Sequence, residues 1–479
     1  MSKQLSRRAF LTLAGAGSAG ALVAACQPQV VTQVVKETVQ VEKVVKETVQ
    51  VEQTVQVEVT KEVQVEVTPT GEKPLLRFAM YNFDPWLAAL PKMFNDFEAE
   101  VGTAQVKLET APWDQFWTRF ESQAAAGIAP DLQIGDPFKV AHYADSGIYL
   151  NIDPYIERDK VNLEDWLAAT IGACRYEKSV GRIGQGSLWG MPATLVGTIL
   201  YYNKGLFDAA SVAYPTADWT RADYQAAGLK LTKDSAGKTA SETGFNPDDV
   251  AVYGSSTIGG YSTAVHLWNN GGGLVSDDQK ECWISKPESI EIFQWLQDLV
   301  LKDKVNPDPS WFTGQPDTFL TERVAMKVDG SWNVDYYVTN LPFKWDIAPI
   351  PKGTKGLPLV SYAGTNTLHI YSGTKTPDQS WDLLKYISGP GGMKYFLATG
   401  TPALISAAGS KEYMTGQPEH RQVAVDVGAY GRTYYPDLGN DQWKLVYDQE
   451  IQALWLGKGD AQTVSTDICA KIDPILAKL

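Results

Sequence analysis

Aromatic side chains are the compositional outlier of this chain of 479 residues, which contains 15 Trp and 22 Tyr. A flat ring can stack on the apolar face of a ring-shaped solute, while carboxylates and amides can bind the hydroxyl groups at its rim. Most aromatic rings simply fill cores, so the rings in polar loops are the informative ones. Two loops combine aromatic and acidic residues, Tyr81-Asn82-Phe83-Asp84-Pro85-Trp86 and Gly135-Asp136-Pro137-Phe138.

Short apolar runs precede both loops, and helical patterns follow them, which predicts an α/β fold. The predicted strands are 75–80 (LLRFAM), 106–110 (VKLET) and 130–134 (PDLQI), and a helix is predicted over 113–127. In open α/β sheets, ligands lie beyond the carboxyl ends of the strands. We therefore expect one cleft to contain Tyr81, Asp84, Trp113 and Asp136.

The stretch AMKVDGSW (residues 325–332) predicts a strand, a turn at Gly330 and a helix that begins at Ser331. Such a helix start presents free backbone N–H groups at the carboxyl end of the strand. Trp332 is therefore a candidate for stacking on a ligand. The alternative is that its indole only seals the helix onto the sheet.

The N-terminus has the features of an export signal. It contains the twin-arginine stretch Ser6-Arg7-Arg8-Ala9-Phe10-Leu11, followed by apolar residues up to Ala25 that are too few to span a bilayer comfortably. Val23-Ala24-Ala25-Cys26 resembles the lipobox of bacterial lipoproteins. That resemblance implies a signal peptide over 1–25, cleavage before Cys26 and a lipid on its sulfur, which would hold the protein at the extracytoplasmic face of the cell membrane.

A low-complexity segment follows the cysteine. Over 26–73 the chain repeats V, T, Q, E and K, and VVKETVQVE occurs twice. Its valine spacing fits neither a heptad nor a 3.6-residue stripe, so we expect a spacer without a core. The part from Gln27 to Thr70 would reach at most about 150 Å when extended, so it could hold a domain away from the membrane.

The remaining chain, about 400 residues, is long enough for two lobes. The net charge of −14 argues against nucleic acid as a partner. Three further cysteines have no CxxC spacing, so they predict no metal site. One pair of them could form a disulfide outside the cell, and the sequence leaves open which pair it is among Cys174, Cys282 and Cys469.

Four segments in sequence order resemble the extracellular sugar-binding proteins of ABC importers, the family of maltose-binding protein. They are 129–156 (APDLQIGDPF and on), 186–210 (GSLWGMPATLVG and on), 319–337 (FLTERVAMKVDGSW and on) and 345–388 (WDIAPIPKGT and on). The resemblance implies a two-lobed periplasmic-binding-protein fold of type II with a hinge. It places the N-terminal lobe at 74–197 and 351–402 and the C-terminal lobe at 198–350 and 403–479, with crossovers near Val196–Ile199, Pro349–Lys352 and Thr401–Leu404.

The resemblance also implies a function and a set of residues. The protein would bind a mono- or oligosaccharide between its lobes and deliver it to an ABC permease, as a monomer, with no cofactor, metal or catalysis. By matching positions, Trp332 would be the stacking tryptophan, with Tyr261, Gly364 and Thr365 as further ligand contacts. Val196 and Gly135 replace a glutamate and a tryptophan of the family pattern, so maltose itself is not supported.

Two other functions compete with this interpretation. An exported carbohydrate-active hydrolase needs a pair of carboxylates, but Glu164-Asp165 lies beside a helical pattern that is typical of a solvated face, and GxSxG and HExxH do not occur. A ferric-iron carrier would use adjacent phenolates, and three tyrosine pairs fit that description. They are Tyr201-Tyr202, Tyr336-Tyr337 and Tyr434-Tyr435.

Overall fold

The computed structural model describes residues 73–312, 317–433 and 442–478. The predicted signal peptide, Cys26 and most of the predicted spacer lie outside these residues. From Pro74 on, the chain forms a unit of its own that is distinct from the preceding residues. Within the described residues, no helix has both the length and the apolar character needed to cross a membrane.

The first sheet has the strand order β2-β1-β3-β14-β7. β1 (Leu75–Tyr81) pairs in parallel with β2 (Gln105–Ala111) and β3 (Leu132–Gly135), and β3 pairs antiparallel with β14 (Thr367–Ile370). β14 also pairs antiparallel with β7 (Met191–Pro192). All three strands predicted at this end of the chain are present, and their apolar side chains form the first core, which includes Phe78, Leu132 and Ile134.

Helices pack around this sheet. The predicted helix over 113–127 is α3 (Trp113–Ala125). On α2 (Asp84–Glu100), the side chains of Leu90, Phe94 and Phe97 are buried on one face, which explains its position against the sheet. The other elements of this region are α4 (Pro137–Asp145), α5 (Asp153–Asp159), α6 (Ala168–Ala173), β4 (Arg175–Glu177), β5 (Arg182–Ile183), β6 (Ser187–Leu188), α12 (Pro377–Ser388), α13 (Pro390–Phe396), α14 (Ile405–Ala408) and α15 (Lys411–Met414).

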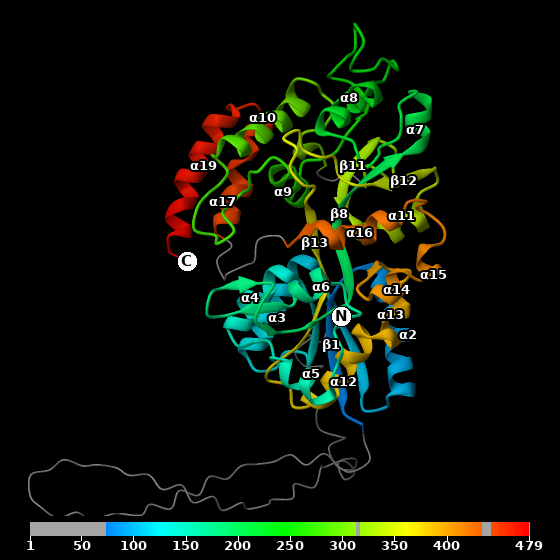
Figure 1. The fold of residues 1–479 in the computed structure, drawn as a ribbon, viewed down its shortest axis with the longest axis vertical. Coiled ribbons are helices and arrows are strands. Elements are labelled where there is room, and N and C mark those ends of the chain that lie inside the picture. Colours follow the sequence, from blue (N-terminus) through cyan, green and yellow to red (C-terminus); the bar gives the residue numbers. More distant parts are fainter. Residues whose placement is uncertain (1–72, 313–316, 434–441, 479) are drawn as a thin grey trace, which may run out of the picture. The chain divides into compact units, whose positions relative to one another are not determined.

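The second sheet is built on one long strand, β8 (Thr194–Asn203), which is buried along its whole length. β8 pairs with β11 (Met326–Gly330), β12 (Trp345–Ala348), β13 (Ser361–Gly364) and β15 (Thr401–Pro402), and β13 also pairs with β16 (Gly431–Arg432). In Figure 1, β8 runs between the group of elements around β1 and the group around β11 and β12.

The second core is formed between this sheet and helices from distant parts of the sequence. It includes Phe207, Leu267, Leu296 and Ile468. The remaining elements are α7 (Lys204–Ala209), α8 (Arg221–Leu231), β9 (Lys233–Asp234), β10 (Val250–Val252), α9 (Gly260–Trp268), α10 (Pro287–Leu301), η1 (Pro309–Phe312), η2 (Ser331–Asn333), α11 (Val334–Asn340), α16 (Gln422–Tyr430), α17 (Gln442–Glu450), α18 (Gln452–Trp455) and α19 (Ala461–Leu476). Each sheet therefore has its own core.

The chain passes between the two sheets at sites defined by strand pairing. It leaves β7 of the first sheet and enters β8 of the second at Ala193, and it leaves β13 and enters β14 at Thr365 and Asn366. The latter passage lies later than the predicted crossover at Pro349–Lys352, because β12 and then β13 both pair with β8 first. The division of the chain into lobes at the predicted residues stays a prediction.

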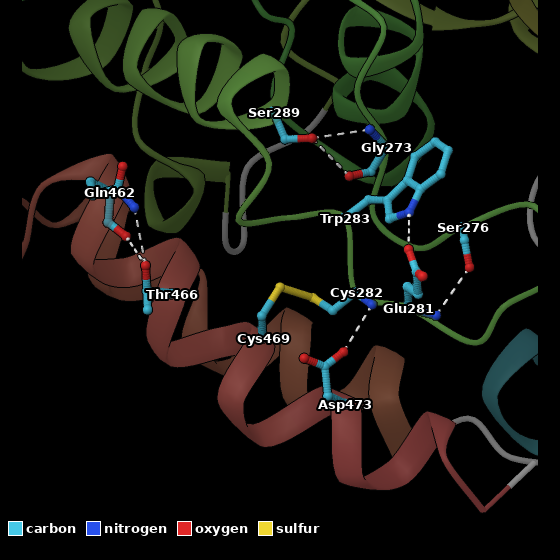
Figure 2. The surroundings of a disulfide bond; sticks show 10 residues. All are labelled: Gly273, Ser276, Glu281, Cys282, Trp283, Ser289, Gln462, Thr466, Cys469 and Asp473. Carbon is cyan, nitrogen blue, oxygen red and sulfur yellow. Dashed lines mark hydrogen bonds between the residues drawn. A yellow bond between two sulfur atoms is a disulfide. The ribbon is translucent and has the colours of Figure 1, made fainter.

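A disulfide joins Cys282 to Cys469, with a Cα–Cα distance of 5.4 Å, and Cys174 is a buried free thiol. Figure 2 shows the bond between α19 and the loop that precedes α10, with Asp473 accepting a hydrogen bond from the backbone N–H of Cys282 at 2.9 Å. The bond spans 187 residues of sequence. It settles which of the three possible pairs forms.

Candidate functional site

The carboxyl ends of β1, β2 and β3 bring three of the predicted residues together. Tyr81 ends β1, Trp113 begins α3 directly after β2, and Asp136 follows β3. The rings of Tyr81 and Trp113 meet edge to face with centroids 4.6 Å apart. Trp113 is 42% exposed, so a flat indole surface remains open beside the half-buried phenol.

Asp136 acts electrostatically on the phenol of Tyr81. It caps α4, and its carboxylate accepts a hydrogen bond from the backbone N–H of Phe138 at 3.5 Å. Burial raises the pKa of this carboxyl to about 7, against the lowering effects of that hydrogen bond and of Lys139. A half-buried carboxyl with one long hydrogen bond has acceptor capacity left for a ligand.

Asp84 is not part of this group. It is the exposed first residue of α2, and none of the described side chains donates a hydrogen bond to its carboxylate. Asp84 was predicted to lie with the others because it follows the same strand, but two residues separate it from the end of β1. An exposed acid in the first turn of a helix is explained by the helix dipole alone.

The second sheet contributes a second group of rings. Tyr261 lies in the first turn of α9, Trp332 lies in η2, and Tyr362 lies in β13. Tyr261 stacks on Tyr362 with ring centroids 4.4 Å apart and meets Trp332 at 5.8 Å in a T-shaped contact. Tyr261 and Trp332 were predicted to be neighbours of a ligand, and the structure brings them together.

Tyr362 was missed by the sequence reasoning. The sequence pattern could have predicted it. Alternate residues of a strand point to the same face, and Tyr362 lies two positions before the predicted Gly364. A Cβ on Gly364 would lie 2.3 Å from the phenol oxygen of Tyr362. Gly364 is therefore glycine because the ring covers it, while Thr365 is 1% exposed and donates its hydroxyl to the carbonyl of Asn366 at 3.0 Å.

Asp136 acts electrostatically on both groups of rings. Burial raises the pKa of Tyr81 and of Tyr362, and for both phenols the charge of Asp136 adds to the increase. Tyr362 also shares a side-chain hydrogen bond with Tyr261. The charge of one carboxyl thus acts on a phenol from the first sheet and on a phenol from the second.

The turn that holds Trp332 differs from the prediction. Ser331 begins a short 3-10 turn, and α11 follows three residues later. The hydroxyl of Ser331 does not cap a helix, because it accepts a hydrogen bond from the backbone N–H of Gly197 at 3.0 Å. A Cβ on Gly330 would lie 2.1 Å from the indole of Trp332, so the ring packs directly on this glycine.

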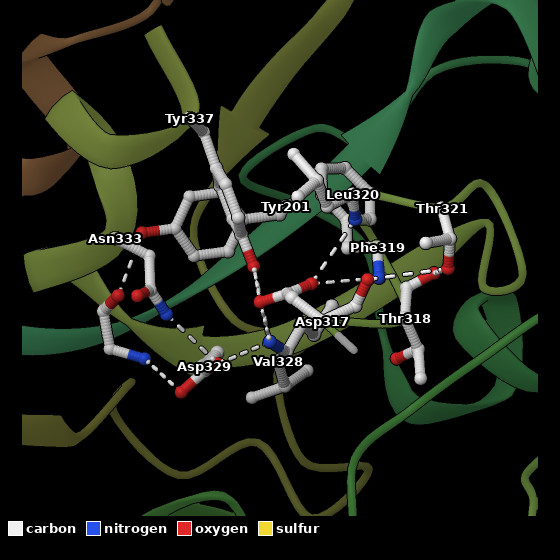
Figure 3. A network of polar contacts seen from close by, with 12 residues as sticks. Tyr201, Asp317, Thr318, Phe319, Leu320, Thr321, Val328, Asp329, Asn333 and Tyr337 are labelled. Atoms are coloured by element: carbon white, nitrogen blue, oxygen red, sulfur yellow. Dashed lines mark hydrogen bonds and ion pairs between the residues drawn. The ribbon is translucent and has the colours of Figure 1, made fainter. Parts of the chain in front are cut away.

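A partly buried polar network supports the same turn (Figure 3). The ammonium of Lys327 lies 2.8 Å from Asp329 and 3.1 Å from Asp317. Asp329 in turn accepts hydrogen bonds from the backbone N–H of Gly330 at 2.7 Å and from the amide of Asn333 at 3.0 Å. The residues on both sides of Trp332 are thereby fixed, so its indole is preorganised.

Asn366 is a second residue that the sequence reasoning missed. It is the next residue after the predicted Thr365, and its amide nitrogen donates to the phenol oxygen of Tyr81 at 2.9 Å. Its side-chain oxygen accepts a hydrogen bond from the hydroxyl of Thr194 at 2.7 Å. It therefore connects the site to β8.

The departure from the family pattern at Gly135 has a local cause. A Cβ on Gly135 would lie 2.5 Å from the imidazole of His369, which fills that space. His369 stacks on Tyr149 with ring centroids 3.7 Å apart, and burial lowers its pKa to about 3. A larger residue at position 135 has no room.

The residues behind the competing functions have structural partners. Tyr201 is fully buried and donates to the carbonyl of Gly330 at 2.7 Å, and Tyr337 donates to Asp317 at 2.8 Å. Tyr434 and Tyr435 lie outside the described residues. Asp165 accepts hydrogen bonds from the backbone N–H and the hydroxyl of Ser406 at the start of α14, as a structural carboxylate does.

One further cluster of possible metal ligands occurs among the described residues, at Asp346, Glu419 and His420. Asp346 is fully buried and accepts hydrogen bonds from the backbone N–H and the ring of His420 at 3.0 and 2.8 Å. The ammonium of Lys204 lies 3.1 Å from Glu419 and 3.8 Å from Asp346. The lysine already supplies the positive charge that these carboxylates need.

Comparison with known proteins identifies relatives of this chain. Residues 82–394 match the family described as bacterial extracellular solute-binding protein. A binding protein of Brucella abortus (strain 2308) is 20% identical over 390 residues, which are 80% of this chain and 88% of that protein.

Two solved structures have a similar fold. The first is an ABC substrate-binding protein from Listeria monocytogenes in complex with cycloalternan, with a TM-score of 0.72 and 23% identity over 85% of this chain and 99% of that one. The second is the cyclic alpha-maltosyl-1,6-maltose binding protein from Arthrobacter globiformis, with a TM-score of 0.68 and 21% identity over 85% of this chain and 100% of that one.

These likenesses confirm the predicted α/β, two-lobed fold. The family match covers more than half of the sequence, from the loop after β1 to α13. The chain belongs to the family of bacterial extracellular solute-binding proteins.

Proposed function

We propose that this protein binds a mono- or oligosaccharide between the two groups of rings and delivers it to an ABC permease. Two observations support this most directly. Tyr81 packs on Trp113, and Tyr261 packs on Trp332 and Tyr362, while the charge of Asp136 acts on a phenol of each group. Of the two similar structures described above, one is a complex with cycloalternan and the other is a cyclic alpha-maltosyl-1,6-maltose binding protein.

The energetics of such a site suit a sugar. Stacking one face of a sugar on a ring buries roughly 50 Å² of apolar surface, which is worth about 1 to 2 kcal/mol. Each hydroxyl left without a partner in a closed site costs about 1 to 3 kcal/mol. The rings would supply affinity, while Asp136 and the hydrogen bonds around it would select the arrangement of hydroxyls.

The proposed cellular setting follows from the N-terminal residues. A lipid on Cys26 would hold the protein at the extracytoplasmic face of the membrane, and the spacer would let the two-lobed part reach its permease. The disulfide between Cys282 and Cys469 suits such an oxidising location. The protein would act by binding alone.

Isothermal titration calorimetry and thermal shift against a panel of neutral saccharides test the proposal. The panel contains cyclic and linear α-glucosides and linear mannosides, and ferric citrate forms a separate arm. We expect at least one saccharide to raise the melting temperature and to bind with a measurable heat. A visible charge-transfer band with ferric citrate, together with no response to any saccharide, would overturn the proposal in favour of iron transport.

A further inference from the structure

The chain segments that pass between the two sheets meet at one residue, Thr194. Its main chain pairs with Pro402 of β15, while the preceding residue, Ala193, donates its N–H to the carbonyl of Asn366 at 2.9 Å. A Cβ on Gly400 would lie 3.2 Å from the methyl group of Thr194. The two passages between the sheets, at Ala193 and at Asn366, thus lie beside β15 at this buried threonine.

Asn366 joins this meeting point to the ligand site. Its side-chain oxygen accepts the hydroxyl proton of Thr194 at 2.7 Å, and its amide nitrogen donates to the phenol oxygen of Tyr81 at 2.9 Å. Its carbonyl accepts two further hydrogen bonds, from the backbone of Ala193 and the hydroxyl of Thr365. Both faces of the residue are therefore engaged, one toward the passages and one toward the site.

This arrangement constrains the chemistry of Tyr81. Because the phenol oxygen accepts a proton from Asn366, its own O–H must point elsewhere. The rings packed on Tyr81, those of Trp113 and Phe116, offer no strong acceptor on their faces. Neither ring takes up the phenolic proton, so this proton is available to a ligand oxygen.

We propose that Asn366 is a positioning residue that fixes Tyr81 as a hydrogen-bond donor toward the ligand and ties that orientation to the passages between the lobes. This inference rests on the proposed function, since it names a determinant of the same site. Burial supports it, because the raised pKa of Tyr81 keeps the phenol protonated. A ligand oxygen that can accept from Tyr81, such as a sugar hydroxyl, is then favoured over a group that can only donate.

The test compares variants of the full chain purified in detergent, with maltotriose, mannotriose and cycloalternan as probes. Asn366→Asp keeps the size and the acceptor for Thr194 but removes the donor to Tyr81. Tyr81→Phe removes the phenol, and Asn340→Asp on the exposed side of α11 is the matched control. We expect Asn366→Asp and Tyr81→Phe each to weaken binding of the best probe at least about tenfold, and the control to bind like the parent.

The double variant separates positioning from general damage. If Asn366 acts through Tyr81, the double variant Asn366→Asp/Tyr81→Phe binds no more weakly than the single variant with the lower affinity, because the two residues form one unit. Additive losses, or an Asn366→Asp variant that binds like the parent, would overturn the inference. The inference would also be overturned if the control Asn340→Asp weakened binding of the probe as much as Asn366→Asp does.

A measurement without sugar keeps the inference testable if none of the probes binds. Spin labels at the exposed positions Lys92 on α2 and Ala226 on α8 report the distance between the two sheet groups. We expect Asn366→Asp to broaden this distance distribution and Tyr81→Phe to leave it unchanged, since only Asn366 joins the passages. An unchanged distribution in Asn366→Asp would overturn the link to the passages, whereas failure of every probe to bind the parent would count against the proposed function alone.

Discussion

At the scale of single residues, Trp332 is the ring whose loss is expected to matter most. Its indole packs on Gly330 and meets Tyr261, and the surrounding turn is held by Asp329 and Asn333. We predict that Trp332→Ala weakens saccharide binding by about 2 kcal/mol or more, as expected for a buried aromatic anchor. Calorimetry on the variant, with Trp283→Ala as a control outside the site, measures this. Unchanged affinity with normal folding would rule out stacking on Trp332.

Asp136 gives a prediction about pH. Its pKa is about 7 in the folded protein and near 3.8 in an unfolded chain, so between these pH values the folded state holds the extra proton. The free energy of unfolding therefore falls as pH rises through this window, by at most about 1.4 kcal/mol per pH unit. Asp136→Asn removes this dependence. Urea unfolding at pH 5 and pH 8 should show a larger gain from the substitution at pH 8, and an equal difference at both pH values would contradict the prediction.

The sequence revealed those residues of the site whose position follows from strand ends or from matched motifs. Tyr81, Trp113 and Asp136 came from topology, and Tyr261 and Trp332 came from the family pattern. Asn366 and Tyr362 were missed because their roles depend on contacts with residues far away in sequence, such as Tyr81 and Tyr261. Asp84 lies apart from the rings, because proximity along the chain does not fix the direction of a side chain, and its contact with a ligand stays a prediction.

At the scale of elements, the disulfide ties the C-terminal helix α19 to the loop before α10. We predict that the double variant Cys282→Ser/Cys469→Ser loses about 2 to 5 kcal/mol of unfolding free energy, because a long loop is no longer closed in the unfolded chain. Urea unfolding with and without dithiothreitol measures the loss. The reductant should destabilise the parent and leave the variant unchanged, and a parent that is equally stable in both conditions would contradict the role of the bond.

The elements themselves were predictable where a simple pattern decides them. The apolar strands at 75–80 and 106–110 and the helix from Trp113 follow from alternation and periodicity, and the structure contains all three. The strand pairing around the predicted crossover near Pro349–Lys352 was not predictable, because short strands carry no sign of which sheet they join. β12 and β13 both pair with β8, and that pairing depends on the tertiary fold rather than on their four residues each.

At the scale of the whole molecule, each sheet has its own core and few chain segments pass between the sheets, which is the arrangement expected of two lobes that rotate about their connections. A saccharide shifts the balance between open and closed arrangements only if it contacts both parts, since equal affinity for the two would shift nothing. The rings of Tyr81 and Trp113 belong to one sheet group and those of Trp332 and Tyr261 to the other. The site is therefore placed where a ligand can bias the motion.

The predicted spacer should contribute to delivery and not to binding, because every residue proposed to contact the ligand lies beyond Pro74. We predict that deletion of Val30 to Thr68 leaves the calorimetric affinity for saccharide within about twofold of the parent. Uptake of labelled saccharide by cells carrying the transporter should fall, because the spacer, which could reach at most about 150 Å, no longer separates the body from the membrane. A Cys26→Ser variant is the companion measurement, since it should release the protein from the membrane at unchanged affinity. A loss of affinity of tenfold or more on deletion, which corresponds to about 1.4 kcal/mol of binding free energy, would show that these residues take part in the binding site.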